Sequence, residues 1–381
     1  MFSIKTSEDR RHKIIKILGI KIKFKRNKIK VLNDTLKREN NNLSTQIRFV
    51  CEENISLLKN CSRFIQSAAG KKVYLLNDTR REDCHLGCSI VVKNIEQLLK
   101  SIGCEIVFYD ATSPISNINT SNYREIINAC DFVLFNGEGS LHDDHGQQMY
   151  EKCKIAKELN KKVHLINSVW QNNKQVEKYL NLFDTISLRE TASYNELPDE
   201  FKKKALVIGD LSLWGDKKDG NGNKVKKLIF TDSCVLNTAK ELLRLSEKYG
   251  GEFYFMYPFL NEFEGIERKY LDENLFANLS SDSLIVTGRF HALTLAIKYK
   301  IPTLAIPSNT HKVEGLLHDA GLSDFLVSDL SKLEDKIIEF KNRNNEDFIK
   351  KATLYHDDTQ MKIQNLFTAK IRGESDVLSR V

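Results

Sequence analysis

SLIVTGRFHALT, residues 283–294, is the stretch of sequence that decides the fold. Its apolar run Leu284–Val286 is interrupted by Thr287 and Gly288. The apolar residues that follow recur at helical spacing, at Phe290, Leu293 and Ile297. This pattern predicts a buried strand that turns directly into a helix, which is the repeating unit of a parallel α/β sheet.

Arg289 and His291 fall in the first turn of this predicted helix. The unpaired backbone N–H groups and the positive dipole end of such a turn favour an anion. A guanidinium and an imidazole at that place form a site for an anion that also exchanges a proton. The alternative interpretation is an Arg289 that caps a neighbouring carbonyl and a His291 that packs under a loop.

Strand and helix patterns alternate on both sides of this stretch, in two series. The chain has 381 residues, 41% of them hydrophobic, which is enough for two α/β domains and too many for one compact core. The first series of predicted strands is Val73–Leu76, Glu105–Tyr109, Phe132–Phe135, Val163–Asn167, Thr185–Leu188 and Leu206–Ile208. The second series is Leu228–Thr231, Phe253–Tyr257, Leu284–Val286, Thr303–Ile306 and Phe325–Val327. We therefore expect two Rossmann-like parallel-sheet domains that face a cleft, with ligands at the carboxyl ends of the strands.

A polar, glycine-rich stretch separates the two series. It reads WGDKKDGNGN from Trp214 to Asn223, a composition typical of a loop between domains. The predicted organisation is a basic amphipathic leader at 1–31, a helical segment at 32–70, an N-terminal Rossmann-like domain at 71–210, a linker at 211–227, a C-terminal Rossmann-like domain at 228–345 and a helical tail at 346–381.

The positive charge of the chain is concentrated in the leader. The formal net charge is +7, residues 1–30 alone carry +9, and the remaining residues sum to −2. A nearly neutral body argues against a nucleic-acid partner. Isoleucine and lysine alternate between Lys13 and Lys30, which gives the leader an apolar and a cationic side in either a strand or a helix. Such a segment suits an anionic membrane surface. The alternatives are a solvated basic tail and a small hairpin packed on the body.

The expected location is cytoplasmic, with peripheral association at the inner membrane. No apolar run approaches the roughly 20 residues of a spanning helix, and no cleavage signal follows the leader. The polar, Asn-rich residues 32–67 predict a stalk, or a helix that pairs with a second copy in a homo-oligomer. The eight cysteines are scattered without a CxxC motif, which is typical of reduced thiols.

One group of metal-ligating residue types occurs near the start of the first domain. Cys84, His85 and Cys88 could offer ligands to a metal ion. No second cluster in the sequence completes a tetrahedral set, so we expect no metal site.

The loop after the third predicted strand carries candidate catalytic groups. It reads NGEGSLHDDH from Asn136 to His145. Gly137 and Gly139 permit close approach of a ligand to the backbone, Asn136 and Ser140 could orient a polyol, and the Glu138 carboxylate favours a sugar hydroxyl over a phosphate. Glu138 or His142 is the candidate general base. The alternative is a tight turn in which Glu138 pairs with a neighbouring Lys or Arg, and the acidic and His residues at 142–145 are also those of a metal loop.

Two further basic residues follow predicted strands. Arg189 comes directly after Thr185–Leu188, and Lys312 opens a helix after Thr303–Ile306. An Arg suits bidentate binding of a carboxylate or phosphate, and a Lys at a helix start indicates a bound anion nearby. Surface positions for both side chains are the alternative.

At these residues the chain resembles the polysaccharide pyruvyl transferase family, whose members look like two-domain GT-B-type transferases. The resemblance covers roughly residues 72–330. Its most specific part is Thr287-x-Arg289-x-His291, followed about twenty residues later by Lys312. The other matching pieces are Asn77, Gly87, Asn136–Ser140, Ile186–Glu190 and Val313.

The resemblance implies a transferase of surface-polysaccharide biosynthesis that needs no cofactor. The donor would be phosphoenolpyruvate and the acceptor a saccharide or lipid-linked glycan of a bacterial capsule or lipopolysaccharide. By resemblance Arg289 binds the donor phosphate or carboxylate, His291 acts as the acid, and Lys312 lies near the substrate. Arg189 would help to stabilise the departing phosphate.

One departure from the family pattern supports a second interpretation. Members that form pyruvate ketals tend to carry three glycines where this chain has Gly137-Glu138-Gly139. The same superfamily looks to include glycosyltransferases. In that case the helix of Arg289 and His291 would hold a nucleotide-sugar diphosphate, and Glu138 or His142 would be the base.

Overall fold

The computed structural model describes residues 2–6, 12–17, 20–25, 70–80, 85–111, 120–216, 225–256, 263, 266, 268–279 and 282–373. The chain divides into two units, residues 1–63 and residues 64–381. The predicted helical segment 32–70 lies outside the described residues except for Gly70.

The leader contains a three-stranded antiparallel sheet. Its strands are β1 (Phe2–Thr6), β2 (His12–Ile17) and β3 (Ile20–Lys25), in the order β1-β2-β3. The register aligns Ile4 with Ile15 and Ile15 with Ile22 across the sheet. The alternation of isoleucine and lysine is therefore that of a strand, where successive residues belong to opposite faces.

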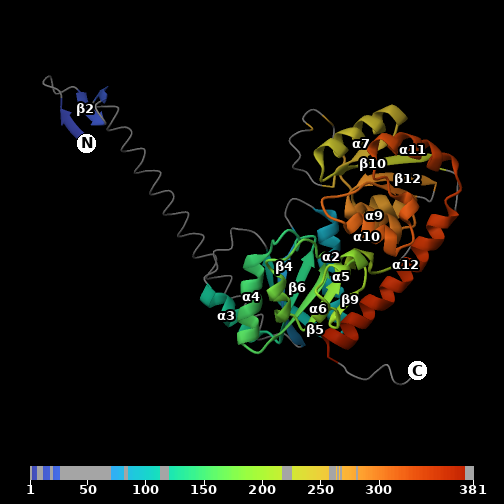
Figure 1. Ribbon diagram of the computed structural model, residues 1–381, viewed down its shortest axis with the longest axis horizontal. Coiled ribbons are helices and arrows are strands. Elements are labelled where there is room, and N and C mark those ends of the chain that lie inside the picture. The colour runs from blue at the N-terminus through green and yellow to red at the C-terminus, as the bar shows by residue number, and fades with distance from the viewer. Residues whose placement is uncertain are drawn as a thin grey trace. The chain divides into compact units, whose positions relative to one another are not determined.

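The first series of predicted strands forms one parallel six-stranded sheet in the order β5-β4-β6-β7-β8-β9 (Figure 1). Its strands are β4 (Lys71–Asp78), β5 (Cys104–Ala111), β6 (Phe132–Glu138), β7 (Lys162–Ser168), β8 (Thr185–Leu188) and β9 (Ala205–Val207). The longer connecting helices are α2 (Leu86–Ser101), α3 (Thr120–Ala129) and α4 (Gln147–Glu158), with η1 (Glu177–Leu182), α5 (Thr191–Asn195) and α6 (Asp199–Lys202) as short ones. The strand order reverses between β4 and β6, and ligands of open α/β sheets bind at such a switch point.

The second series forms a parallel four-stranded sheet in the order β11-β10-β12-β13. Its strands are β10 (Lys227–Ser233), β11 (Glu252–Tyr254), β12 (Ser283–Gly288) and β13 (Thr303–Ala305). Its helices are α7 (Leu236–Tyr249), α8 (Glu273–Asn278), α9 (Phe290–Lys298), α10 (Lys312–Asp319) and α11 (Leu333–Asn342). Here the order reverses between β10 and β12, so the strand of the SLIVTGRFHALT stretch stands beside the switch point.

The last predicted strand of the second series, Phe325–Val327, is wrong. The structure has a 3-10 turn, η4 (Ser323–Phe325), followed by a single bridge from Leu326 to Ala305. The aromatic ring of Phe325 packs against those of Phe340 and Phe348. The apolar run thus reflects burial in the core rather than a full strand.

α9 is buried on every side. All nine of its residues are buried, and Ser212 of the turn η2 (Leu211–Leu213) donates a hydrogen bond to Thr294 at 2.7 Å. The helix therefore lies inside the fold rather than on its surface. Because α9 is held between the two sheet regions, the side chains of its first turn have fixed positions.

The predicted linker 211–227 therefore begins with a buried turn. Residues 217–224 of the linker lie outside the described residues, and β10 begins at Lys227. Among the described residues, no helix combines the length and the apolar character needed to cross a membrane.

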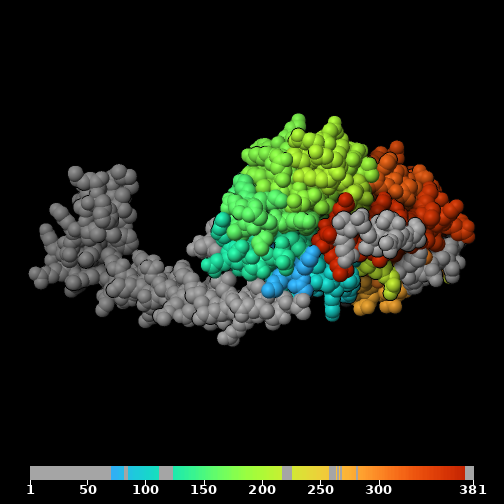
Figure 2. Space-filling view, turned by 90° about the horizontal axis from the view of Figure 1, so that it is seen from below, coloured from blue at the N-terminus to red at the C-terminus, as the bar shows by residue number. Residues whose placement is uncertain are grey.

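The predicted helical tail joins the two halves. α12 (Glu346–Asn365) runs into a π-helical segment, η6 (Leu366–Ile371). Phe348 and Ala352 belong to the core of the second sheet, whereas Ile363 and Phe367 belong to the core of the first. Figure 1 shows α12 passing along both halves, and Figure 2 shows the red C-terminal segment beside the blue residues of the first sheet.

Candidate active site

The ends of β4 and β6 are tied together by two asparagines. The Asn77 side chain donates a hydrogen bond to the Asn136 carbonyl oxygen at 2.6 Å, and the Asn136 side chain donates to the Asn77 carbonyl oxygen at 3.4 Å. Asn77 has a φ of 67°, in the left-handed region that asparagine tolerates better than most residues. Both side chains are buried, so they fix the switch point of the first sheet.

The loop after β6 turns sharply at Glu138. Its φ of 45° is unusual for a residue with a side chain, and such strain is typical of functional sites. Gly137 is required here because a Cβ at this position would lie 2.4 Å from Ser168 Oγ. The backbone N–H of Ser140 closes the turn onto the Gly137 carbonyl oxygen at 3.1 Å. The Glu138 side chain is only 4% exposed.

Arg189 is one of the largest fully buried side chains, 2% exposed. Its Nε lies 2.8 Å from Asp210 Oδ2 and its Nη2 lies 3.8 Å from Glu138 Oε1. The guanidinium also lies over the ring of Phe290, 5.1 Å from the centroid. The sequence interpretation missed Asp210, although this residue follows β9 as Arg189 follows β8. The buried carboxylate compensates the buried guanidinium.

Arg289 is the N-cap residue of α9 rather than a residue of its first turn. Its Nε donates to Asp232 Oδ1 at 2.9 Å and its Nη2 pairs with Asp232 Oδ2, which is a bidentate contact. Asp232 is fully buried and also accepts a hydrogen bond from the Met256 N–H at 3.0 Å. The sequence interpretation missed Asp232 as well. This carboxylate holds one edge of the Arg289 guanidinium in place.

His291 lies in the first turn of α9, as predicted, and approaches α2 closely. A Cβ at Gly87 would lie 2.0 Å from His291 Cγ, so only glycine lets the first turn of α2 reach the imidazole. His291 Nε2 lies 3.9 Å from Glu138 Oε1. Both atoms are buried and have no hydrogen-bond partner among the described residues. The structure therefore joins the candidate acid of the second half to the candidate base of the first.

The surroundings set the charges of this pair. Burial raises the pKa of Glu138 above its usual range, against the opposing effect of Arg189. Burial lowers the pKa of His291 well below its usual range, and Arg189 and His85 lower it further. The imidazole is thus neutral in this ligand-free site, and a carboxylic acid is favoured over a carboxylate at Glu138 more than it is in water.

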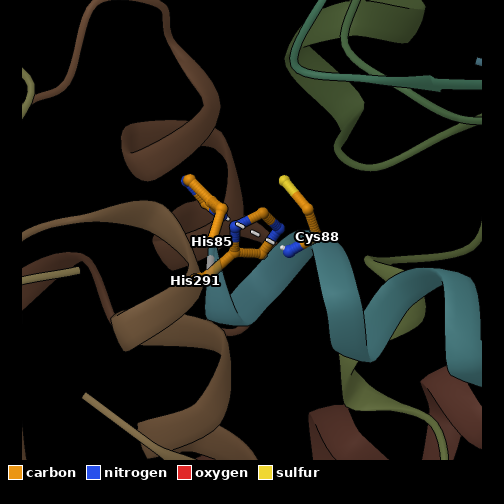
Figure 3. A group of neighbouring side chains, drawn as sticks. All are labelled: His85, Cys88 and His291. Atoms are coloured by element: carbon orange, nitrogen blue, oxygen red, sulfur yellow. Dashed lines mark hydrogen bonds between the residues drawn. The ribbon is translucent and has the colours of Figure 1, made fainter. Parts of the chain in front are cut away.

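Two side chains of α2 complete the surroundings of His291 (Figure 3). His85 is the N-cap residue of α2 and accepts a hydrogen bond from the Cys88 N–H at 3.4 Å. His85 and His291 meet edge to face, with ring centroids 5.6 Å apart. The pKa of the Cys88 thiol is raised well above the usual range by burial and then by the charge of Glu138.

Lys312 reaches the same place from the second half. It opens α10, as predicted, and its Nζ donates to Asn309 Oδ1 at 2.8 Å. A Cβ at Gly139 would lie 3.8 Å from Lys312 Nζ and 3.9 Å from Arg189 Nη1. Burial lowers the pKa of Lys312, against the opposing effect of Cys234. Gly139 therefore leaves room in front of two cations.

His142 is placed differently from the other candidate residues. Its Nδ1 lies 2.8 Å from Asp143 Oδ2, and its ring contacts that of His145. None of its contacts within the described part of the chain reaches Glu138 or His291. Glu138 is thus the better placed of the two predicted bases.

A second histidine crosses between the halves beside this site. His311 Nε2 lies 3.3 Å from Glu190 Oε1, and His311 Nδ1 lies 3.3 Å from Glu196 Oε1. Burial acts to lower the pKa of His311, but the hydrogen bond and charge of Glu190 outweigh it and raise the pKa. Thr191 N–H also donates to Asp319 Oδ2 of α10 at 2.7 Å. These contacts tie α5 to α10.

The assembled site has a clear chemical character. Three cationic side chains, Arg189, Arg289 and Lys312, surround a buried pair of proton-exchanging groups, Glu138 and His291. Carboxylates at Asp210 and Asp232 fix the orientation of the two guanidinium groups. Such an arrangement is chemically suited to hold an anion in a place with little water and to move a proton next to it.

The chain is similar in structure to UDP-GlcNAc 2-epimerase of Methanocaldococcus jannaschii in complex with UDP-GlcNAc and UDP, with 12% identity, a TM-score of 0.46, and coverage of 72% of this chain and 93% of that chain. It is also similar to MurG of Acinetobacter baumannii, with 13% identity, a TM-score of 0.45, and coverage of 77% and 98%. These TM-scores are too low to support an argument, so the fold rests on the two parallel sheets themselves.

No curated protein matches the chain. The model of the family described as polysaccharide pyruvyl transferase matches residues 85–310, more than half of the chain. The matched range includes the ends of β6, β8 and β12, from which Glu138, Arg189 and His291 enter the site. The chain belongs to the polysaccharide pyruvyl transferase family and is a transferase.

Proposed function

We propose that this transferase moves the pyruvyl group of phosphoenolpyruvate onto two hydroxyl groups of a saccharide. The observation that carries the proposal is the buried Glu138–His291 pair, 3.9 Å apart, among three cationic side chains. Phosphoenolpyruvate is small, carries a phosphate and a carboxylate, and reacts by proton transfer to carbon. The site offers cationic side chains for the phosphate and the carboxylate, and the Glu138–His291 pair for the proton transfer.

The cations match the charge of this donor. Arg289 is held by Asp232 through Nε and Nη2, which directs the remaining edge of the guanidinium away from Asp232. Arg189 and Lys312 both face the space next to Gly139. We assign Arg289 to the carboxylate or phosphate of the donor, and Arg189 with Lys312 to the phosphate that departs. Asn77, Asn136 and Ser140 would orient the acceptor from the ends of β4 and β6.

The pair of Glu138 and His291 would handle the proton. A proton from His291 adds to the methylene carbon of phosphoenolpyruvate, and a saccharide hydroxyl oxygen bonds to the adjacent cationic carbon. Breaking the bond to the phosphate oxygen releases phosphate, and a second hydroxyl oxygen takes its place to close the ketal. Two hydroxyl protons are released and one proton is added to carbon, so one proton leaves with the phosphate. A bound dianion would raise the pKa of His291 from its low value in the ligand-free site.

The leader suggests where the acceptor lies. Its antiparallel sheet alternates isoleucine and lysine, and residues 1–30 carry a net charge of +9. We propose that residues 1–31 bind an anionic membrane at the cytoplasmic face, where a lipid-linked glycan of a capsule or lipopolysaccharide would be presented. Co-sedimentation with anionic liposomes should decrease after removal of residues 1–31 and in high salt. Equal sedimentation of the shortened protein would contradict this part of the proposal.

A second candidate function rests on Glu138. A carboxylate beside His291 and close to Gly139 is suited to deprotonate a sugar hydroxyl, as a glycosyltransferase needs. The cations would then hold the diphosphate of a nucleotide sugar.

Ligand-dependent melting separates the two candidates without knowledge of the acceptor. Phosphoenolpyruvate at 100 times its Kd should stabilise the protein by about 2.7 kcal/mol, and nucleotide sugars should leave the melting temperature unchanged. The opposite result favours the glycosyltransferase. Phosphate release from phosphoenolpyruvate in the presence of a panel of saccharides then tests the reaction itself.

A further inference from the structure

We propose that His85, Cys88 and His291 form a binding site for a thiophilic divalent metal ion, zinc above all, and that the bound ion blocks transfer. The blocking effect rests on the proposed function of His291, whereas the binding does not. The sequence offered Cys84, His85 and Cys88 as ligands but no second cluster. Cys84 lies outside the described residues, and folding brings His291 of α9 beside His85 and Cys88.

The geometry of the three residues is close to that of a metal centre. One ligand atom of each lies within 4.8 Å of the others. In a tetrahedral zinc site with bonds of 2.0 to 2.3 Å, ligand atoms are about 3.6 Å apart. Side-chain rotations that move each ligand atom by about 1 Å would therefore close the site.

Glu138 stands beside His291, although it is not a member of this group of three. Glu138 Oε1 lies 3.9 Å from His291 Nε2. Both atoms are buried without a hydrogen-bond partner among the described residues, a costly state that a ligand would relieve. The group of two imidazoles and one thiolate is typical of zinc and unlike the all-oxygen sets of calcium or magnesium.

Local structure holds these ligands in place. His85 is the N-cap of α2 and Cys88 follows three residues later, so both face the same side of the first helical turn. Gly87 lets that turn approach His291, where any Cβ would overlap the imidazole. His291 in turn belongs to the fully buried α9.

The two nearby guanidinium groups do not prevent metal binding. Arg189 is paired with Asp210 at 2.8 Å, and Arg289 makes a bidentate pair with Asp232. Each guanidinium charge is thus compensated locally. A thiolate at Cys88 and a carboxylate at Glu138 then balance the two charges of the ion. An ion bound there would engage His291 and remove it from proton transfer.

Cobalt serves as the probe because a thiolate bound to Co²⁺ gives a charge-transfer absorption that water and carboxylate ligands do not. We expect the full chain to develop this absorption on titration with Co²⁺ and to lose it when Zn²⁺ displaces the cobalt. Cys88→Ser should abolish the absorption. Cys234→Ser removes an exposed thiol and should keep it. No absorption in the unmodified protein, or an unchanged absorption in Cys88→Ser, would overturn the proposal.

His85→Gln guards against a folding artefact, because His85 is only half-buried and the variant can be checked by its melting temperature. The His85→Gln variant keeps all its cysteines and should bind Co²⁺ at least tenfold more weakly than the unmodified protein. Unchanged affinity in a folded His85→Gln protein would also overturn the metal site.

Inhibition is measured separately, as the Zn²⁺ concentration that halves phosphate release. His85→Gln should raise that Zn²⁺ concentration at least tenfold, whatever the basal rate of the variant. A chelator should restore phosphate release by the zinc-inhibited unmodified protein. Zinc that binds without slowing release would refute the blocking effect. Cobalt binding in a protein that releases no phosphate would leave the metal site standing and sink the proposed transfer.

Discussion

Replacing Gly87 by alanine should slow transfer by acting on His291 alone. A Cβ at this position lies 2.0 Å from His291 Cγ and 2.1 Å from Nδ1. Ordinary contacts need about 3.4 Å, so the imidazole or the first turn of α2 must move by about 1.4 Å. α9 is buried on every side and cannot shift as a whole. Misplacement of a catalytic group by about 1 Å costs on the order of 10²-fold in rate, which is the loss that we expect in kcat.

The effect on stability should be much smaller. Alanine is favoured over glycine in a helix by up to about 1 kcal/mol, and overpacking costs about 1–3 kcal/mol. We therefore expect a net destabilisation of about 0–2 kcal/mol, and an intact stabilisation by phosphoenolpyruvate because Arg189, Arg289 and Lys312 are untouched.

The assay is phosphate release with saturating donor, beside thermal melting with and without donor. Lys93→Ala is the control, since Lys93 is an exposed residue of the same helix. It changes α2 without adding a group beside His291, and should keep kcat within about threefold. If Gly87→Ala turns over as fast as the unmodified protein, or if both variants lose activity equally, the placement of His291 against α2 has no catalytic role.

Four further outcomes are expected. His291→Ala should lower kcat by on the order of 10²–10⁴ and leave donor-induced melting shifts in place; a loss of the shift instead would make His291 a binding residue. Arg289→Ala leaves the buried Asp232 carboxylate without its partner and should destabilise the protein by about 3–5 kcal/mol in denaturant unfolding. The double variant Arg289→Ala/Asp232→Ala should be more stable than Arg289→Ala alone. The pKa of His311 is raised in the folded protein, so the charged imidazole stabilises the fold below about pH 6.5, and this stabilisation is lost as the pH rises through the folded pKa. His311→Gln should therefore lower the melting temperature more at pH 6 than at pH 8.5. Equal decreases in melting temperature at the two pH values would rule out a charged pair. Phe367→Ala opens the core that α12 reaches and should cost about 3–5 kcal/mol, whereas an effect below 1 kcal/mol would mean that this contact is not kept in solution.

Local patterns predicted most of the fold. The SLIVTGRFHALT stretch predicted β12 and α9 correctly, because an apolar run, a break at Thr287 and Gly288, and apolar residues at helical spacing follow one another within a dozen residues. The same reasoning failed at Phe325–Val327, where three consecutive apolar residues pack into the core but do not form a β-strand. Short apolar runs do not distinguish these two uses.

The site was predicted only where a residue follows its own strand. Glu138, Arg189, His291 and Lys312 were found in this way, and the structure brings them together. Their partners Asp210 and Asp232 were missed, because a local pattern does not show which carboxylate from another strand will meet which cation. Roughly 200 residues separate Cys88 from His291, so the third member of that cluster depends on how the two sheets meet.

The return of the chain at α12 and η6 sets the order in which the protein can fold during synthesis. The core of the first sheet contains Ile363, Leu366, Phe367 and Ile371 beside strand residues such as Val73. Roughly 160 residues are translated between the end of that sheet at Val207 and Ile371. At 5–20 residues per second this takes on the order of 10 to 30 s, during which apolar surface of the first domain stays uncovered. The first half of this protein to leave the ribosome is therefore the last to have its core completed.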